Sequence, residues 1–222
     1  MTNFDITIQS KDLLKLVTLA GSTVERRNII PILNNFKLEA KDNLLIVTAT
    51  DMSVSVVQEI GAQVKVEGSV TASCQILSEI IKKIPDSNVH IKLIGDLLEI
   101  SATNCKFHLP VLQAQQFPTI LDGQDLKEVM ILASDLVKLL EYTRFSVAME
   151  ETRYNLGGIY LNFTDTKLVA ASMDGHRLSV AEIARDDKLG NISLIIPRKT
   201  VSEIVKIFTD TKYADSNIQV LL

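Results

Sequence analysis

Two stretches of this chain repeat one another: "LNNFKLEAKDNLLIVTATDMSVSVVQEI" at residues 33–60 and "LGGIYLNFTDTKLVAASMDGHRLSVAEI" at residues 156–183. Aligned without gaps, they share eight of 28 residues, and apolar and polar positions alternate in the same way. The same shift of 123 residues aligns "DLLKLV" at 12–17 with "DLVKLL" at 135–140. A repeat of this length predicts two copies of one domain.

The repeat continues downstream in the same order. "SEIIK" at 78–82 matches "SEIVK" at 202–206, and "DSNVHIKL" at 86–93 matches "DSNIQVLL" at 215–222. We therefore place copy one at residues 1–122 and copy two at residues 128–222. The segment between them contains Pro118 and Gly123 and has the composition of a linker.

Copy two ends where copy one continues with "IGDLLEISATNCKFHLPVLQAQQFP", a stretch with two strand patterns. We therefore expect copy two to lack its last strands and the parent protein to be longer than this chain.

Each copy is predicted to be an α+β unit of order βαββ(β)αβββ, with helices on one side of antiparallel sheets. The opening strands are "DITIQ" and "VMILA", and turns are expected at "AKDN" and "FTDT". Apolar residues at helical spacing predict four helices, with two or three strands between the helices of each copy. The expected helices are Lys11–Gly21, Gln75–Ile84, Ser134–Phe145 and Arg198–Phe208.

Composition excludes several classes of protein. Hydrophobic residues make up 46% of the 222 residues, which excludes a disordered chain. No apolar run approaches 18 residues and the N-terminus lacks a signal-peptide pattern, so we expect a cytoplasmic protein that does not contact a membrane. Cys74 and Cys105 are far apart in the sequence, which favours reduced thiols over a disulfide or a metal site.

The charge is unevenly distributed. The four expected helices hold nine basic and five acidic residues, a net +4, in a chain of net charge −4, so the remainder carries −8. Such segregation would attract a polyanion to the helices and repel it elsewhere. Ordinary solvated lysines on helix surfaces are the alternative explanation.

The motifs "RRNIIPILNNFKLEA", "TRYNLGGIYLNF", "AASMDGHRLSVAEI" and "IIPRKTVSEIVKIF" resemble the bacterial DNA polymerase III beta subunit, the replicative sliding clamp. The resemblance covers essentially the whole chain. It implies a non-catalytic processivity factor with no cofactor, whose three-domain protomers pair head to tail into a ring around duplex DNA. Helices face the DNA and sheets form the outside. The third domain is absent from this chain, so we expect a monomer or a loose association.

The resemblance also implies residues that contact DNA without sequence preference. Arg27 and Tyr154 match DNA-contacting positions, and Arg198 and Lys199 keep a basic motif. Asn155 stands where the family often has a second aromatic residue, Gln75 where it has a basic one, and Glu150 where it has glutamine. These departures weaken the expected DNA contacts.

The cluster Asp174, His176 and Arg177 is the most polar part of the repeat. Copy one keeps the aspartate as Asp51 but has Ser53 and Val54 in place of the other two residues, so the aspartate is predicted to fix a turn through backbone N–H groups. A catalytic Asp–His pair would need a nucleophile, for which Ser172 and Ser179 are near only in sequence.

A metal site is disfavoured because the three histidines, at positions 90, 108 and 176, lie in separate strand patterns. We therefore expect neither catalytic residues nor metal ligands.

The resemblance implies that this cluster is part of a pocket for short, partly apolar motifs of the DNA polymerase III alpha subunit and of clamp-loader subunits. The implied pocket residues are Leu156, Met173, Gly175, His176, Arg177 and Leu178. Met173 stands where most members have a small hydroxylated residue, which would reshape the pocket. The alternative for His176 is a half-exposed strand residue with one hydrogen bond.

A second contact surface is implied at "CKFHLPV", residues 105–111, an edge strand that pairs with the third domain of another protomer. Phe107 and Leu109 are the expected apolar contacts and Lys106 a charge at the rim. The alternative for Leu109 is an ordinary core residue.

Two other functions stay open. One is a hydrolase that uses Asp174 and His176, and the other is an ordinary DNA-groove binder or a regulatory fragment of the clamp.

Overall fold

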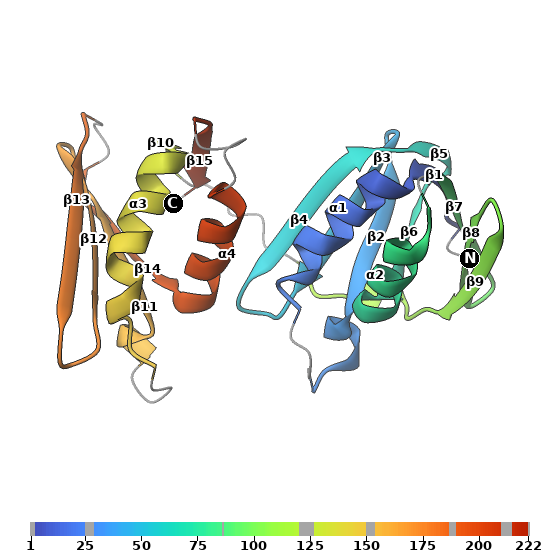
Figure 1. Cartoon of the computed structure of the whole chain (residues 1–222), viewed down its shortest axis with the longest axis horizontal. Helices are drawn as coiled ribbons and strands as arrows, with labels where there is room; N and C mark the ends of the chain where they lie inside the picture. Colours follow the sequence, from blue (N-terminus) through green and yellow to red (C-terminus); the bar gives the residue numbers. More distant parts are fainter. Residues whose placement is uncertain are drawn as a thin grey trace. The chain divides into compact units, whose positions relative to one another are not determined.

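The computed structural model describes residues 3–24, 29–85, 87–119, 127–149, 154–186, 190–209 and 215–221. The chain divides into two compact units, a first unit of residues 1–121 and a second unit of residues 122–222 (Figure 1). Each unit has its own hydrophobic core.

The first unit consists of two antiparallel sheets and a pair of helices. The sheets have the strand orders β5-β1-β7-β8-β9 and β4-β3-β2-β6, and α1 and α2 pack against each other (Figure 1). The elements are β1 (Asp5–Gln9), α1 (Ser10–Gly21), the 3-10 turn η1 (Pro31–Asn34), β2 (Asn35–Lys41), β3 (Leu44–Thr50), β4 (Ser55–Gly61), β5 (Gln63–Val66), β6 (Gly68–Ser73), α2 (Cys74–Lys83), β7 (Asn88–Ile94), β8 (Leu97–Ala102), β9 (Cys105–Pro110) and η2 (Ala114–Gln116).

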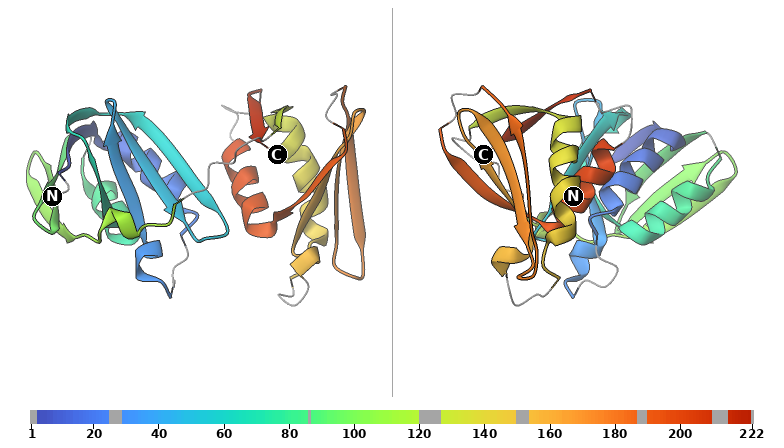
Figure 2. Two further views of the ribbon diagram at one scale, coloured as in Figure 1. Left: turned by 180° about the vertical axis from the view of Figure 1, so that it is seen from behind. Right: turned by 60° about the vertical axis from the view of Figure 1, so that its left-hand side comes forward.

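The second unit repeats this plan. Its four-stranded sheet has the order β13-β12-β11-β14, and β10 pairs with β15 in a second, two-stranded sheet (Figure 2). The elements are β10 (Glu128–Leu132), α3 (Ala133–Thr143), η3 (Arg144–Ser146), η4 (Tyr154–Leu156), β11 (Gly158–Phe163), β12 (Lys167–Met173), β13 (Leu178–Ala184), β14 (Ile192–Pro197), α4 (Arg198–Phe208) and β15 (Asn217–Leu221).

Residues that are identical in the two copies occupy equivalent places in the two four-stranded sheets. Leu45 is opposite Ile60 across β3 and β4, and Leu168 is opposite Ile183 across β12 and β13. Both leucines are fully buried. The shared apolar positions therefore fix the same register in each hairpin, because a slip of one residue would turn the buried side chains outward. The predicted α+β fold is confirmed.

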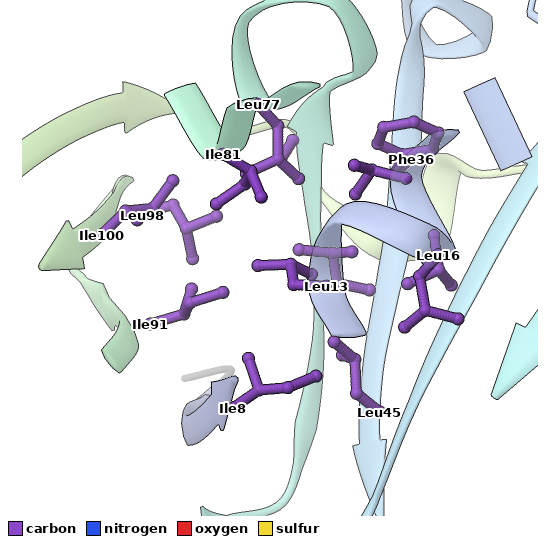
Figure 3. Packing of buried hydrophobic residues seen from close by; sticks show 14 of the residues in the cluster. Ile8, Leu13, Leu16, Phe36, Leu45, Leu77, Ile81, Ile91, Leu98 and Ile100 are labelled. Carbon is purple, nitrogen blue, oxygen red and sulfur yellow. The ribbon is translucent and has the colours of Figure 1, made fainter. Parts of the chain in front are cut away.

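The first core is closed by residues that converge from both helices and both sheets. Leu13 of α1, Leu77 and Ile81 of α2, and Ile91 and Leu98 of the five-stranded sheet are almost completely buried and point toward one another (Figure 3). The apolar stripe of each helix thus faces the sheets, which leaves its polar residues on the opposite side.

The strand count between the helices was underestimated. Among the residues that the structure describes, the first unit has five strands between α1 and α2, and the second has four between α3 and α4. The extra strands of the first unit are separated only by Ala62 and Glu67, so no cluster of turn residues marks their ends. Apolar spacing in the expected helix Gln75–Ile84 predicts a buried Ile76, but this residue is 46% exposed because it lies on the outer side of α2.

The helix bounds also shift the charge count. Arg144 lies in η3, beyond the end of α3. The four helices therefore hold eight basic and five acidic residues, a net +3 instead of the expected +4. Within the described ranges, no helix combines the length and the apolar character that crossing a membrane requires.

Candidate functional site

Asp174 organises the tip of the β12–β13 hairpin. Its Oδ1 accepts hydrogen bonds from the backbone N–H groups of His176 and Arg177, both at 3.0 Å. Its Oδ2 accepts from Arg177 Nε at 2.9 Å, and its own N–H donates to the carbonyl oxygen of Arg177 at 3.3 Å. The hydrogen bond from His176 N–H, followed by those from Arg177, lowers the pKa of Asp174 from 3.8 to about 2. The carboxylate is therefore ionised wherever the protein is folded near neutral pH.

The first unit contains the same turn. Asp51 Oδ1 accepts from the N–H groups of Ser53 at 2.9 Å and Val54 at 2.7 Å, and Asp51 N–H donates to Val54 O at 3.1 Å. The prediction that this aspartate fixes a turn through backbone N–H groups is confirmed in both copies. We call residues 51–54 and 174–177 the aspartate turns.

The second position of each aspartate turn has a positive φ angle. Met52 has φ 75° and Gly175 has φ 92°. Only glycine enters this region without steric cost, so Gly175 suits its turn and Met52 is strained.

The expected pocket residues surround the second aspartate turn. Met173 and Leu178 are paired across β12 and β13 and are 41% and 65% exposed. Gly175, His176 and Arg177 between them are exposed, and Leu156 is half-buried at the end of η4, separated by one residue from the start of β11, which is the neighbouring strand of β12. Five of the six residues thus lie at one hairpin tip, with apolar and basic groups facing solvent.

The neighbouring serines are engaged elsewhere. Ser172 Oγ donates to Thr143 O at 2.5 Å, and Ser179 Oγ lies 2.6 Å from Ser146 Oγ. Both serines are more buried than the exposed His176. The geometry therefore gives His176 neither of these hydroxyls as a nucleophile.

The three histidines occupy separate places. His90 Nε2 lies 2.7 Å from Asp5 Oδ1, and His108 Nε2 lies 3.1 Å from Glu99 Oε2, both in the five-stranded sheet of the first unit. Over the described part of the chain, no group of three or more His, Cys, Asp or Glu side chains is arranged to hold a metal ion. Cys74 is buried, and this burial raises the pKa of its thiol to about 12, so it is an inert thiol.

The structure places some of the residues expected to face DNA. Arg198 and Lys199 begin α4, and Arg198 N–H donates to Gly157 O at 3.1 Å, which joins this helix start to the segment after Asn155. Asn155 is exposed. Gln75 is exposed at the start of α2, where its Nε2 donates to Glu79 Oε1 at 3.2 Å.

Three further positions are not placed. Arg27 and Glu150 lie outside the described residues, as does the side chain of Tyr154, whose backbone begins η4.

The basic helix residues are more exposed than the acidic ones. Seven of the eight are exposed, whereas three of the five acidic residues are half-buried: Asp12, Asp135 and Glu203. The exposed surface of the helices is therefore more positive than the sequence count indicates. Composition alone could not reveal this difference, because it depends on which helix positions face solvent.

The expected dimer edge is β9, which lies at the end of the five-stranded sheet. Lys106 Nζ lies 3.2 Å from Glu99 Oε2, and hydrogen bonding from Lys106, aided by His108, lowers the pKa of Glu99. Phe107 is half-buried. Leu109 is only 3% exposed and belongs to the core, so its side chain is not available on the surface of this unit.

Sequence reasoning missed Phe145. This residue was assigned to a helix, but it lies in η3, is 58% exposed, and has its ring centroid 5.7 Å from Cζ of Arg177. The repeat contained a signal: with the shift of 123 residues, Phe145 aligns with Ser22 and Arg177 with Val54. Both members of the pair are thus specific to copy two.

Comparison with known protein families gives two matches. Residues 4–121 match the N-terminal domain of the DNA polymerase III beta subunit, and residues 131–221 match the central domain of that subunit.

The chain is also similar to individual proteins and solved structures that are named as sliding clamps. The chain is 41% identical to the beta sliding clamp of Rickettsia bellii over 218 residues, covering 98% of this chain and 58% of that protein. The Caulobacter crescentus beta sliding clamp superposes with a TM-score of 0.92 at 35% identity, covering 99% of this chain and 60% of that one. A Pseudomonas aeruginosa sliding clamp bound to griselimycin superposes with a TM-score of 0.91 at 29% identity, covering 99% and 60%. The chain thus spans about three fifths of the length of these relatives.

Proposed function

Since this chain belongs to the DNA polymerase III beta subunit family, we propose that it acts as part of a sliding clamp. Such a clamp is a non-catalytic processivity factor of the replicative polymerase. Its ring of head-to-tail protomers encircles duplex DNA and tethers the polymerase III alpha subunit and clamp-loader subunits through a peptide pocket.

The observation that carries the DNA part of this proposal is the charge on the helices. An acidic chain of net charge −4 exposes seven basic helix residues while it half-buries three of the five acidic ones. Helix surfaces of this kind attract phosphates without reading base sequence. The ring rather than the affinity then retains the protein on DNA, so a modest positive face is sufficient.

The test loads the longest natural product of the gene onto nicked circular DNA with its clamp loader, and then linearises the circle at moderate salt. Release on linearisation is the expected result. Equal retention on circles and linear DNA, lost only as salt rises, would instead indicate an electrostatic groove binder. Arg198→Glu should reduce loading, whereas Lys65→Glu on β5 is a matched control that reverses an exposed charge away from the helices.

The peptide part of the proposal rests on the exposed pair Met173 and Leu178 beside Arg177. Apolar anchors of a partner segment would lie on this pair, and such anchors carry most of the binding energy at peptide sites. Labelled griselimycin is a defined probe, because the Pseudomonas aeruginosa clamp binds it. Leu178→Ala should weaken binding of the probe, whereas Met130→Ala, which removes a 52% exposed apolar side chain of β10, should not. Equal effects of the two variants would contradict this location.

A further inference from the structure

We propose that Phe145 is a positioning residue for the peptide pocket, acting through Arg177. This inference rests on the proposed function, since it concerns the same pocket. Its basis is a group of contacts that join the end of α3 and the following turn η3 to the β12–β13 hairpin, which we call the η3 bracket. The bracket consists of Thr143, Phe145 and Ser146 together with Ser172, Ser179 and Arg177.

Two hydrogen bonds join the last residue of α3 and the last residue of η3 to the hairpin. Thr143 O accepts from Ser172 Oγ at 2.5 Å, and Ser146 Oγ lies 2.6 Å from Ser179 Oγ. Ser172 directly precedes Met173, and Ser179 directly follows Leu178, so both contacts lie immediately behind the exposed pair. Thr143 and Ser146 are fully buried. They hold the turn in place without any help from the Phe145 ring.

The Phe145 ring is not part of these hydrogen bonds, and it lies against Arg177. The guanidinium carbon of Arg177 is 5.7 Å from the ring centroid, within the range of a cation–π contact. Asp174 accepts from Nε on one edge of the same guanidinium. The ring contact and the hydrogen bond at Nε together restrain the Arg177 guanidinium and leave its Nη groups for an acceptor oxygen of a bound segment.

The first unit indicates that the fold does not require this bracket. At the positions that correspond to Phe145 and Arg177 it has Ser22 and Val54. The partners of the two serine contacts also differ: the residues equivalent to Thr143, Ser172 and Ser179 are Ala20, Ala49 and Val56. The first unit nevertheless forms the same hairpin and the same aspartate turn. The bracket is thus an addition to copy two at the hairpin that carries the pocket.

Restraint of Arg177 matters for binding because a free arginine side chain loses rotamer entropy when it is held in one conformation. A guanidinium that is already oriented loses less of it when the partner binds. Cation–π contacts at exposed sites contribute about 0.5–1 kcal/mol, which corresponds to about two- to fivefold in affinity.

The experiment measures binding of the 222-residue chain to purified DNA polymerase III alpha subunit by biolayer interferometry. Phe145→Leu keeps an apolar side chain but removes the ring, and it should weaken binding about two- to fivefold. Phe145→Tyr keeps the ring and should restore it. Tyr142→Leu is the matched control, since Tyr142 is a 59% exposed aromatic residue of α3 that lies near Lys138 instead of Arg177.

A double-mutant cycle separates positioning from direct contact. In an Arg177→Ala background, Phe145→Leu should have no further effect. The same loss in both backgrounds, or no loss in either, would overturn the inference. A second readout needs no partner: the Arg177 Hδ and Hε resonances should carry a ring-current shift in NMR spectra that disappears in Phe145→Leu. Failure of the pocket itself would look different, because Leu178→Ala and Arg177→Ala would then leave alpha-subunit binding unchanged.

Discussion

Replacing Asp51 with alanine is expected to destabilise the first unit by about 1.5 kcal/mol. Asp51 Oδ1 accepts two backbone hydrogen bonds, at 2.9 Å from Ser53 N and 2.7 Å from Val54 N. A hydrogen bond to a charged acceptor contributes about 1.5–3 kcal/mol to the free energy of unfolding when the protein shields it from water. Ser53 is exposed and Val54 is half-buried, so in Asp51→Ala water can accept hydrogen bonds from their backbone N–H groups and offset part of the loss. The remaining loss is comparable to that of a helix N-cap, about 0.5–2 kcal/mol.

The chain contains its own reporter for this measurement. It has no tryptophan, and its four tyrosines all belong to the second unit: Tyr142, Tyr154, Tyr160 and Tyr213. Tyrosine fluorescence therefore follows the second unit, whereas far-UV circular dichroism follows both. In a urea titration at pH 7, with a slope of about 1.5 kcal/mol/M, the first-unit transition of Asp51→Ala should shift by about 1 M. The tyrosine transition should stay in place.

Two further variants make the test specific. Asp51→Asn keeps an acceptor oxygen and should lose less than half as much stability as Asp51→Ala. Asp174→Ala should instead shift the tyrosine transition, because the equivalent turn lies in the second unit. An unchanged dichroism midpoint for Asp51→Ala would refute the reasoning. An Asp51→Asn variant as unstable as the alanine variant would show that the charge, not the accepted hydrogen bonds, holds the turn.

Further predictions concern the two turns and the core. Met52→Gly should stabilise the first unit by about 0.5 kcal/mol, because it relieves about 1–2 kcal/mol of backbone strain at φ 75°, which exceeds the entropy that glycine adds to the unfolded chain. Gly175→Ala should destabilise the second unit by about 1 kcal/mol, because alanine at this positive φ angle is strained. The urea midpoints of the two variants check both predictions. Because the pKa of Asp174 falls from 3.8 to about 2 on folding, its contribution is fully present above about pH 4 and is lost as pH falls toward 2. Tyrosine-monitored urea midpoints should therefore fall more steeply over that window in the wild type than in Asp174→Asn. Leu77→Ala removes a fully buried side chain and should lower the dichroism-monitored stability by about 2–5 kcal/mol, an effect that a surface change such as Lys82→Ala should not reproduce.

Much of the fold was predictable because the repeat supplies two versions of each element. Residues common to both copies, such as Leu45 with Leu168 and Asp51 with Asp174, mark what the fold requires, and the structure gives them equivalent places. The extra strands of the first unit were not predictable, because the chain turns over a single residue at Ala62.

The candidate site was predictable only in part. His176 and Arg177 stood out as residues that copy two adds to a shared turn. The role of Phe145 was hidden, because its contact with Arg177 depends on where the end of a helix meets a hairpin tip. Hydrophobic periodicity describes single helices and strands and contains no information on tertiary contacts between two of them. The exposure of the basic helix residues was hidden for the same reason.

The aspartate turn has a consequence for how this protein can vary. One carboxylate satisfies the backbone of the hairpin tip, so the side chains of the last two residues of the turn are not needed to hold the tip together, whereas the residue directly after the aspartate has a positive φ angle and favours glycine. The chain already demonstrates this freedom, with Met-Ser-Val after Asp51 and Gly-His-Arg after Asp174. Such a tip tolerates the exchange of recognition side chains while the strands below it remain unchanged. Residues 52–54 are accordingly a natural acceptor position, into which Gly-His-Arg or another tripeptide that begins with glycine could be grafted to give the first unit a recognition surface of its own.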